Sequence, residues 1–178
     1  MTKYISLPMT HDEARILKAG ERVLLTGTMY TARDAAHKRL LEEARAGQTL
    51  PVDLENIAIY YAGPAPAKPG QVIGSCGPTT SGRMDAYAPW MMEHGQTVMI
   101  GKGLRNASVI EAMKNYGSVY LTAIGGAGAL LSKCVTRMEC VAYEEFGAEA
   151  IYKLEVKDFP AIVTIDSEGH NLYIREEA

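Results

Sequence analysis

The sequence predicts a single α/β domain that spans residues 1–178. With 178 residues, 47% of them hydrophobic and 22% charged, the chain is long enough for one complete core and short for two. Short apolar runs that are typical of strands recur along the chain, and segments with helical spacing lie between them. A loop of glycine, proline and hydroxyl residues, 77–85, joins one such run to one such segment.

The first third of the chain is expected to alternate between helices and strands. The expected elements are a short helix capped by Thr10 to Glu13, a strand over 21–26, a helix over 28–47 and a strand over 54–61. Gly27 should close the first strand. Thr31 with Asp34 resembles a capping box for the long helix, and Gly47 is a plausible C′ residue. The proline-rich stretch 62–70 should be a stiff surface loop rather than a domain linker.

The remaining elements are expected to continue the same sheet. They are an apolar run over 71–73, a helix over 84–94, a strand over 97–100, a helix ending at Tyr116, strands over 119–124, 137–143 and 151–156, and a hairpin of 159–165 with 172–174. Pro89 should kink or shorten its helix, and Ser108 with Glu111 resembles a capping box. The pair Met91 and Met92 is more typical of a core than of a cofactor site, with a partner surface as the alternative.

The loop over 77–85, Gly-Pro-Thr-Thr-Ser-Gly-Arg-Met-Asp, is the first candidate for a binding site. It offers three consecutive hydroxyls beginning at Thr79, free backbone N–H groups at the coming helix start, and the charge of Arg83. This combination suits an anion. The alternative is a capped loop with an exposed arginine.

Arg33 is a second candidate, because a cation in the first turn of the helix over 28–47 opposes the helix macrodipole. An anionic ligand between the helix start and the guanidinium would favour this placement. Alternatively, Arg33 snorkels or pairs with Asp34 or another acid. His37, one turn later, is either a further ligand contact or a packed, hydrogen-bonded histidine, and the second case is commoner.

Lys102 is a third candidate, because it follows the strand over 97–100 between two glycines. Ligands of open α/β sheets gather at the carboxyl ends of strands, where the 77–85 loop should also emerge. A solvated lysine in a turn is the alternative. A Walker A motif is excluded, and the Gly-Gly-Ala-Gly turn over 125–128 is no dinucleotide fingerprint, so we expect tight packing or a second anion-facing turn there.

Charge and hydropathy exclude several classes of protein. A net charge of −3 leaves no basic surplus for nucleic acid or an anionic membrane. No run approaches the roughly 18 apolar residues of a membrane span, and the first residues lack the apolar stretch of a signal peptide. The cytoplasm is therefore the expected location.

The three cysteines are Cys76, Cys134 and Cys140, and the first lies far from the other two in the sequence. The ligand runs of ferredoxin clusters place their cysteines only about two to four residues apart. We therefore expect ordinary reduced thiols rather than metal ligands or a disulfide framework.

Five motifs, in order along the chain, together resemble the β subunit of class I, iron-sulfur-dependent fumarate hydratases and the related β subunit of L(+)-tartrate dehydratase. They are Gly-Thr-Met-Tyr-Thr-Ala-Arg-Asp-Ala-Ala-His over 27–37, the 77–85 loop, Ile-Gly-Lys-Gly over 100–103, Gly-Gly-Ala-Gly over 125–128 and Phe-Pro-Ala-Ile-Val over 159–163. The resemblance covers nearly the whole chain, and the 77–85 motif is highly specific.

The resemblance implies a swivelling β/β/α three-layer domain, which the family uses as a separate subunit or as the C-terminal half of one long chain. It also implies a divided active site. A partner α subunit would carry a [4Fe-4S] cluster with three cysteine ligands, and its open iron would bind the hydroxyl and a carboxylate of the substrate. This chain would bind no metal, so Cys76, Cys134 and Cys140 would not be ligands, and Met91 and Met92 would be candidates for subunit contacts.

By position in the motifs, the resemblance implies that Thr79 is the base that takes the C3 proton of malate. It implies that Arg33, Arg83 and Lys102 bind the substrate. The residues alone favour the cations, because a dicarboxylate needs paired positive donors. They do not favour Thr79, because an unperturbed hydroxyl is a very weak base.

We therefore expect the β subunit of a heteromeric hydro-lyase that interconverts fumarate and (S)-malate and is inactive without its α subunit. One alternative is the β subunit of L(+)-tartrate dehydratase, which converts tartrate to oxaloacetate. Another is a stand-alone dicarboxylate-binding or anion-binding domain without catalysis. A homodimer is one conceivable state of the isolated chain.

Overall fold

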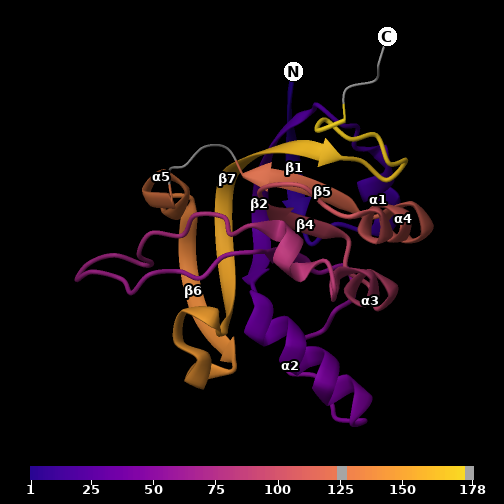
Figure 1. The fold of residues 1–178 in the computed structure, drawn as a ribbon. Coiled ribbons are helices and arrows are strands. Elements are labelled where there is room, and N and C mark those ends of the chain that lie inside the picture. Colours follow the sequence, from indigo (N-terminus) through magenta and orange to yellow (C-terminus); the bar gives the residue numbers. More distant parts are fainter. Residues whose placement is uncertain (124–127, 175–178) are drawn as a thin grey trace.

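The structure, a computed structural model, describes residues 1–123 and 128–174. Within these residues the strands form one sheet in the order β1-β2-β3-β4-β5-β7-β6 (Figure 1). The strands are β1 (Thr2–Leu7), β2 (Arg22–Thr31), β3 (Ala58–Tyr60), β4 (Val98–Gly101), β5 (Val119–Ala123), β6 (Val135–Ala142) and β7 (Ile151–Ile165). Neighbours from β1 to β5 are parallel, whereas β7 is antiparallel to β2, β5 and β6. The fold is thus mixed α/β, as predicted.

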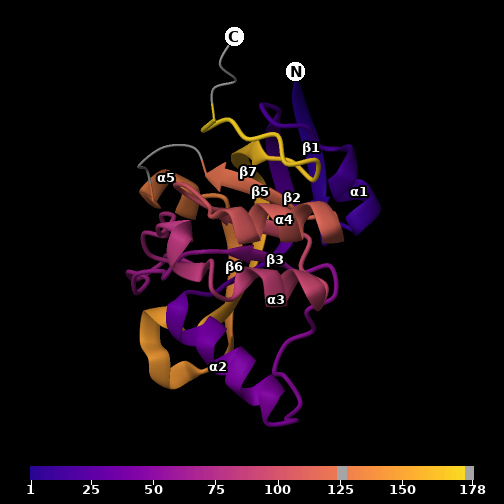
Figure 2. The ribbon, with the colours of Figure 1, turned by 45° about the vertical axis from the view of Figure 1, so that its right-hand side comes forward.

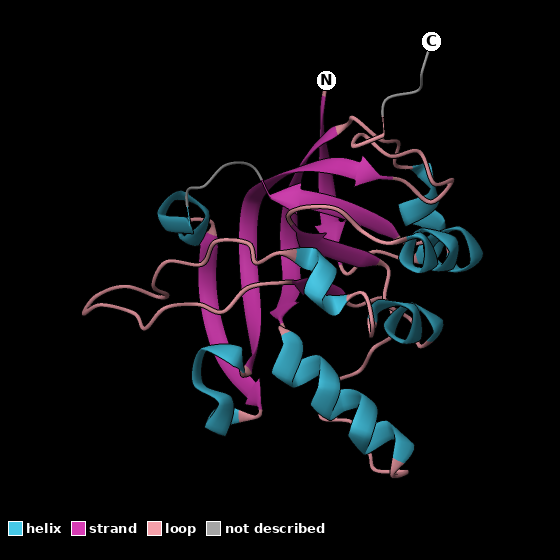
Figure 3. Ribbon diagram, in the orientation of Figure 1, coloured by secondary structure: helices cyan, strands magenta, loops and turns pink. Residues whose placement is uncertain are grey.

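The long strand β7 closes the sheet on itself. One of its edges pairs with β2 from Tyr152 to Ile162, and its other edge pairs with β5 near Ile165 and with β6 near Ile151. Because β2 also begins the parallel run β2-β3-β4-β5, the strands return to their starting point. Figure 3 shows how strongly these strands curve around the interior that they enclose.

The parallel strands are buried on both faces. In β4, Val98 and Ile100 pack in the interior of the closed sheet, whereas Met99 packs in a second hydrophobic cluster outside it. In β5, Val119 faces the interior and Tyr120 faces the outer cluster. This alternation is the period of two that a strand imposes on its side chains. It explains why the strands appear in the sequence as continuous apolar runs.

Helices cover the outer cluster (Figure 2). They are α2 (Asp34–Arg45), α3 (Ala88–Glu93) and α4 (Ala107–Tyr116), and the shorter elements are α1 (His11–Ile16), α5 (Gly128–Ser132) and the 3-10 helices η1 (Ser81–Met84) and η2 (Glu144–Glu149). Met91 and Met92 of α3 are buried in the outer cluster, so they form core and not a surface for a partner. Pro89 lies in the first turn of α3, which begins at Ala88, so this helix is shorter than predicted. None of the helices in the described ranges has both the length and the apolar character that a bilayer span needs.

Of the three predicted capping boxes, one is confirmed and two are wrong. The predicted C′ residue Gly47 is confirmed, because α2 has its C-cap at Ala46 and Gly47 has φ +72°. Thr10 and Glu13 form the expected reciprocal capping box of α1. The predicted box of Thr31 is wrong, because Thr31 still belongs to β2 and α2 begins three residues later. The box predicted for Ser108 is also wrong, because the Asn106 side chain accepts the Val109 N–H at 3.0 Å and caps α4.

Strand β2 does not stop at Gly27. This glycine has φ +130°, and a Cβ at this position would overlap the backbone of Leu7 in β1. The pairing of β2 with β7 shifts register between Leu25 and Gly27, so the glycine accommodates a bulge inside one long strand. Strand β7 is likewise continuous across the gap predicted between 156 and 159.

Two predicted strands are absent from the described residues, and one predicted turn lies outside them. The run over 71–73 belongs to a long loop, in which Ala65 accepts the Gly74 N–H at 3.1 Å and donates to Ser75 at 2.9 Å. Its apolar Ile73 is buried as an anchor of that loop. The run over 172–174 forms no strand, since only Ile165 and Asn171 make a single bridge after β7. Most of the glycine turn over 125–128 lies outside the described residues.

Candidate active site

The loop over 77–85 lies beside the carboxyl ends of β3 and β4. The Thr79 N–H donates to the carbonyl of Tyr61, the residue after β3, at 2.7 Å. The Ser81 N–H donates to the carbonyl of Lys102, the residue after β4, at 2.8 Å, and Thr80 forms a parallel bridge with Lys102. The sequence pattern predicted a strand before this loop and a helix after it. The structure instead has an extended loop before the short helix η1, and this loop docks on the sheet edge.

Ser81 ties the loop to the turn that carries Lys102. Its Oγ accepts the Lys102 N–H at 3.0 Å and lies 2.9 Å from the hydroxyl of Tyr120 in β5. A side chain at Gly101 would overlap this Oγ, so the glycine permits the close approach. The glycine before Lys102 therefore serves the packing of the two loops against each other.

Arg83 and Lys102 are exposed cations, and Thr79, on the same loop as Arg83, is half-buried. Within residues 1–123 and 128–174, neither cation makes an ion pair, and neither side chain has a hydrogen-bond partner. Several other cations in the described residues do pair with an acid, such as Lys3 with Glu21 at 2.7 Å. The edge thus presents two positive charges that are free to bind an anion.

Arg33 comes to the same edge from the end of β2. It is the N-cap of α2 in extended conformation rather than a first-turn residue, so the predicted conflict with the macrodipole does not arise; Asp34 occupies the first turn. A Cβ on Gly63, just after β3, would lie 3.2 Å from the Arg33 side chain. The Arg33 Nε lies 3.9 Å from a carboxylate oxygen of Glu149 in η2, so the alternative of pairing with an acid holds, with an acid other than Asp34.

His37 is a packed, hydrogen-bonded histidine, which is the commoner of the two alternatives that the sequence left open. It is buried, its Nδ1 lies 2.8 Å from the carbonyl of Arg33, and its ring stacks with Tyr87 and meets Tyr61 edge-on. Burial lowers the pKa of His37 to about 4, against a smaller opposing effect of the bond to Arg33. The ring is therefore neutral at pH 7, and Nδ1–H donates to the Arg33 carbonyl.

The start of α2 holds several buried polar atoms that lack a hydrogen bond. They are Arg33 Nε, Asp34 Oδ1 and His37 Nε2, none of which has a partner in the described part of the chain. Unpaired buried polar atoms are uncommon in folded proteins and cost free energy. Their presence next to the carboxyl ends of β2 and β3 indicates a site that is completed by a ligand, a solvent molecule or a further protein surface.

Sequence reasoning missed a buried ion pair beneath the site. The Nε of Arg105 donates to Asp85 Oδ1 at 2.7 Å, and the Arg105 side chain is 0% exposed. Asp85 was noticed only as the last residue of the 77–85 motif, and Arg105 was not noticed at all. No local pattern marks it, because its burial depends on residues that are far apart in the sequence.

The cysteines do not gather into a site in the described residues. Cys76 is buried, Cys134 is half-buried and Cys140 is exposed. Burial raises the pKa of all three thiols, that of Cys76 to about 12, so none is a thiolate at neutral pH. The chemistry of the site edge, with cations and a hydroxyl, suits a carboxylate and not an iron cluster. The expectation that this chain ligates no metal stays a prediction.

One group of possible metal ligands does occur in the described ranges. It consists of Asp166, Glu168 and His170, whose ligand atoms lie within 4.8 Å of one another. The oxygens of Asp166 already accept the backbone N–H groups of Ala19, Glu168 and His170 at 3.0–3.1 Å. These bonds close the turn after β7, so a structural role explains the cluster.

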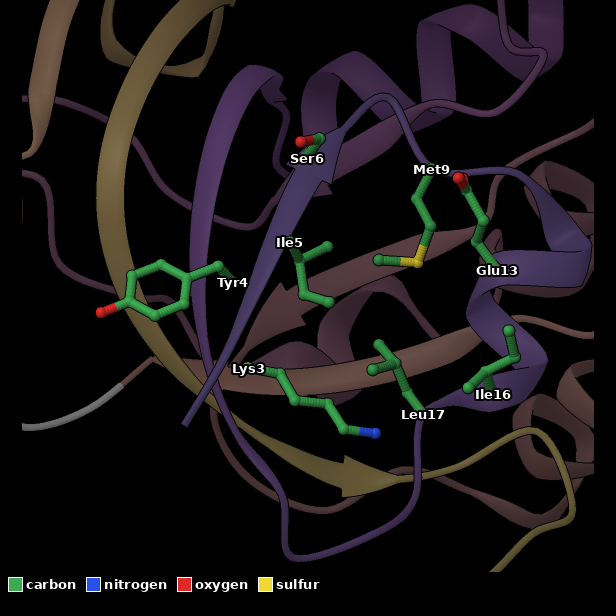
Figure 4. A pocket seen from close by; sticks show the side chains of 8 residues that line it. All are labelled: Lys3, Tyr4, Ile5, Ser6, Met9, Glu13, Ile16 and Leu17. Carbon is green, nitrogen blue, oxygen red and sulfur yellow. The ribbon is translucent and has the colours of Figure 1, made fainter. Parts of the chain in front are cut away.

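A surface cavity of about 330 Å³ lies away from the candidate site, between β1 and α1 (Figure 4). Its lining is residues 3–6 of β1 together with Met9, Glu13, Ile16 and Leu17. Apolar side chains such as Ile5 and Leu17 point into it, and Lys3 is its one cation. None of the four predicted site residues lines this cavity.

Comparison with known proteins gives a consistent result. A family model described as Fumarase C-terminus matches residues 2–176. The anaerobic class I fumarate hydratase of Escherichia coli (strain K12) is 45% identical over 154 residues, which cover 85% of this chain and 28% of that protein. Fumarate hydratase 2 of Leishmania major is 43% identical over 156 residues, which cover 86% of this chain and 28% of that protein.

A relative of similar length carries a different name. A Methanocaldococcus jannaschii protein assigned as an L(+)-tartrate dehydratase subunit beta is 38% identical over 177 residues, which cover 96% of this chain and 91% of that protein. The chain thus spans 28% of the length of the two fumarate hydratases and most of the length of this relative. Since the family model covers nearly the whole chain, the chain belongs to the Fumarase C-terminus family.

Proposed function

We propose that this chain is the β subunit of a heteromeric iron-sulfur hydro-lyase that interconverts fumarate and (S)-malate in the cytoplasm. It would supply the base and the carboxylate-binding cations and would be inactive alone, as a monomer or as a homodimer. The names of the fumarate hydratases that it resembles support this reaction.

One observation carries the proposal. Arg83 and Lys102 lie on loops that are hydrogen-bonded to each other through Ser81, and neither cation has an acid partner in the described residues. Arginine binds a carboxylate through two parallel hydrogen bonds, and lysine adds a compact charge. A dicarboxylate that bridges these loops would supply the anionic charge that the protein itself does not supply there.

The proposed chemistry assigns one task to each group. Thr79 Oγ, as the alkoxide, takes the C3 proton of malate, and the electrons of that C–H bond move toward the neighbouring carboxylate. These electrons then form the C2–C3 double bond while the C2–O bond breaks, and the hydroxide would leave toward the partner subunit. Arg83, Lys102 and Arg33 stabilise the negative charge that develops on this carboxylate. A positive environment also lowers the pKa of a hydroxyl and so raises the fraction of Thr79 that is alkoxide, which is the form that can take the proton. In the reverse direction, Thr79 returns the proton to fumarate.

The [4Fe-4S] cluster is proposed to be in an α subunit, where its open iron would act as a Lewis acid toward the substrate hydroxyl. The lengths of the relatives support the proposal of a second subunit, because the match covers only 28% of each of the two fumarate hydratases. We propose that the present domain swivels over the α subunit and so completes the site. The unpaired polar atoms at the start of α2 would then meet substrate or partner.

A direct test is to coexpress the chain with its α partner and reconstitute the complex without oxygen. The complex should hydrate fumarate, while the isolated chain should not, and iron analysis of the isolated chain should find no cluster. A stoichiometric cluster on this chain would overturn the division of the site. Turnover of tartrate far above that of fumarate would overturn the choice of substrate.

A second candidate is the β subunit of L(+)-tartrate dehydratase. The relative of similar length favours it, because that protein is assigned as a separate beta subunit. Tartrate has one hydroxyl more than malate, and the cations would bind its carboxylates in the same way. A kinetic comparison of dicarboxylates with the complete complex decides between the two. A stand-alone anion-binding domain would instead bind dicarboxylates without a partner and catalyse nothing.

A further inference from the structure

We propose that Arg105 is the positioning residue of the candidate active site, which fixes the Thr79, Arg83 and Lys102 loops relative to one another without touching substrate. The inference rests on the proposed function for its kinetic consequences. Its structural consequence can be measured on the chain without any assay of activity.

The Arg105 guanidinium lies at the centre of a buried network. Its Nε donates to Asp85 at 2.7 Å, and its Nη2 donates to the hydroxyl of Tyr61 at 3.3 Å. Its central carbon lies 4.8 Å from the ring centre of Tyr120 and 5.3 Å from that of Tyr61. Three elements that are distant in the sequence therefore meet at one cation.

Three of the residues that Arg105 contacts each hold one part of the site, whereas its further contact, from Nη1 to Met99 Sδ at 3.4 Å, is to the core of β4. Asp85 follows directly after η1, which contains Arg83. The carbonyl of Tyr61 accepts the Thr79 N–H at 2.7 Å. The hydroxyl of Tyr120 lies 2.8 Å from the carbonyl of Gly103, next to Lys102.

The network also extends to Arg33, the third cation of the proposed site. The ring of Tyr61 lies 5.6 Å from the ring of His37, and His37 donates to the carbonyl of Arg33. Arg105 is thus linked, through one intervening residue or two, to every member of the proposed site. It lies beneath the site, since its own side chain is 0% exposed.

Stability alone does not account for a charge at this position. A buried ion pair is costly to desolvate, and well-packed apolar residues of the same size often serve stability as well or better. The pair instead fixes the orientation of the neighbouring groups, because a planar guanidinium holds its hydrogen-bond partners at defined angles. Asp85 uses both oxygens in this way, since Oδ2 accepts the Asn106 N–H at 2.8 Å.

The test uses a variant that is designed to keep the fold. Removing one partner alone would leave a buried unpaired charge, whereas Asp85→Leu with Arg105→Met replaces both. Arg105→Lys is the second variant, because it keeps the charge but not the planar fork. Thr97→Val is the matched control: its hydroxyl is buried and donates to Met9 at 2.7 Å, just before the amino end of β4.

Amide hydrogen exchange on the full chain measures how firmly the hydrogen bonds of the loops are held. In the double variant the Thr79 and Ser81 amides should exchange at least about tenfold faster, because the acceptors of their hydrogen bonds are no longer held. Arg105→Lys should move the same amides by a smaller factor, and Thr97→Val should leave them unchanged. A folded double variant with wild-type exchange at both amides would overturn the proposal.

Kinetics of the complex with its α subunit provide the second measurement. The double variant should lose about 100-fold in kcat, because a misplacement of about 1 Å in a reacting group can have this effect. Thr97→Val should lower Tm and leave kcat and KM unchanged. Wild-type kcat in the double variant would overturn the positioning role. A wild-type complex that hydrates no dicarboxylate would instead overturn the proposed function, while the exchange experiment would still decide the role of Arg105.

Discussion

Two regions of this protein concentrate charged side chains, and they differ in how the charges are satisfied. At the turn after β7, Asp166 accepts three backbone N–H groups and His170, and Glu168 pairs with Lys18 at 2.9 Å. At the carboxyl ends of β3 and β4, Arg83 and Lys102 have no acid partner in the described residues. The first region resembles a metal site by residue type, and the second resembles an ordinary charged surface.

The difference indicates that an unpartnered charge at the carboxyl ends of strands, and not the density of charged residues, marks the candidate site. A carboxylate whose lone pairs all accept N–H groups has little left to offer a ligand. A cation with no partner keeps its full capacity for a carboxylate. The following predictions test whether this distinction separates function from structure.

The largest effect is expected at Thr79. In the complex with its α subunit, Thr79→Ala should lower kcat by about 1,000-fold, the typical contribution of a positioned general base. Assembly and Tm should stay unchanged, because no hydrogen bond of its side chain is seen in the described residues, whereas its backbone N–H bond to Tyr61 is kept. Steady-state kinetics check this, with Thr79→Ser as the control that restores a hydroxyl. Full activity in Thr79→Ala would remove its role as base.

Removal of the unpaired cations should weaken substrate binding. Arg83→Met and Lys102→Met should each raise KM by about 10- to 100-fold, the value of one or two charge-assisted hydrogen bonds. Arg83→Lys should recover only part of the loss, because lysine cannot bind bidentately. Lys157→Met is the matched control, an exposed lysine on β7. Equal KM values in all four variants would contradict the distinction between the two regions.

The sequence predicted those features that depend on local pattern. The cap at Thr10, the runs that form the parallel strands and the burial of Met91 follow from residues that are near one another in the chain. The candidate cations were predicted by residue type together with position at strand ends, and their roles stay predictions. Thr79 was proposed through family resemblance alone, because nothing in the chemistry of a free threonine singles it out.

The features that sequence reasoning missed depend on contacts between distant segments. The closure of the sheet requires β7 to pair with β2 and β5 at once, and no local pattern encodes two partners. In the sequence, Arg105 is one more cation in a loop. Only the packing of Asp85, Tyr61 and Tyr120 around it makes it the centre of a buried network. Caps were misplaced where a polar residue close to the true N-cap also fitted the pattern, as Ser108 did beside Asn106.

The buried histidine predicts a dependence of stability on pH. The pKa of His37 is about 4 in the folded state and near 6.5 when unfolded, so between these values the unfolded chain binds more protons. The free energy of unfolding should therefore fall by about 3 kcal/mol as the pH is lowered from 7 to 4. Urea unfolding at several pH values measures this. His37→Asn, which keeps a donor near Arg33 but does not titrate, should lose this part of the pH dependence.

The smallest effect is expected from Asp166→Asn, which turns one acceptor oxygen into a donor that faces N–H groups. Unfolding free energy should fall by about 1–3 kcal/mol, the cost of a mismatched buried hydrogen bond. Although burial alone would raise it, the bonds from Ala19 and His170 hold the pKa of Asp166 below its usual value. Wild-type stability should thus decrease below about pH 4, and the variant should lack this contribution.

Activity of the complex should not change, and added Ca²⁺ or Zn²⁺ should not raise the wild-type Tm. If either metal stabilised the wild type and not the variant, the paired acidic turn would be a ligand site after all, and lack of a partner would no longer distinguish the two charged regions.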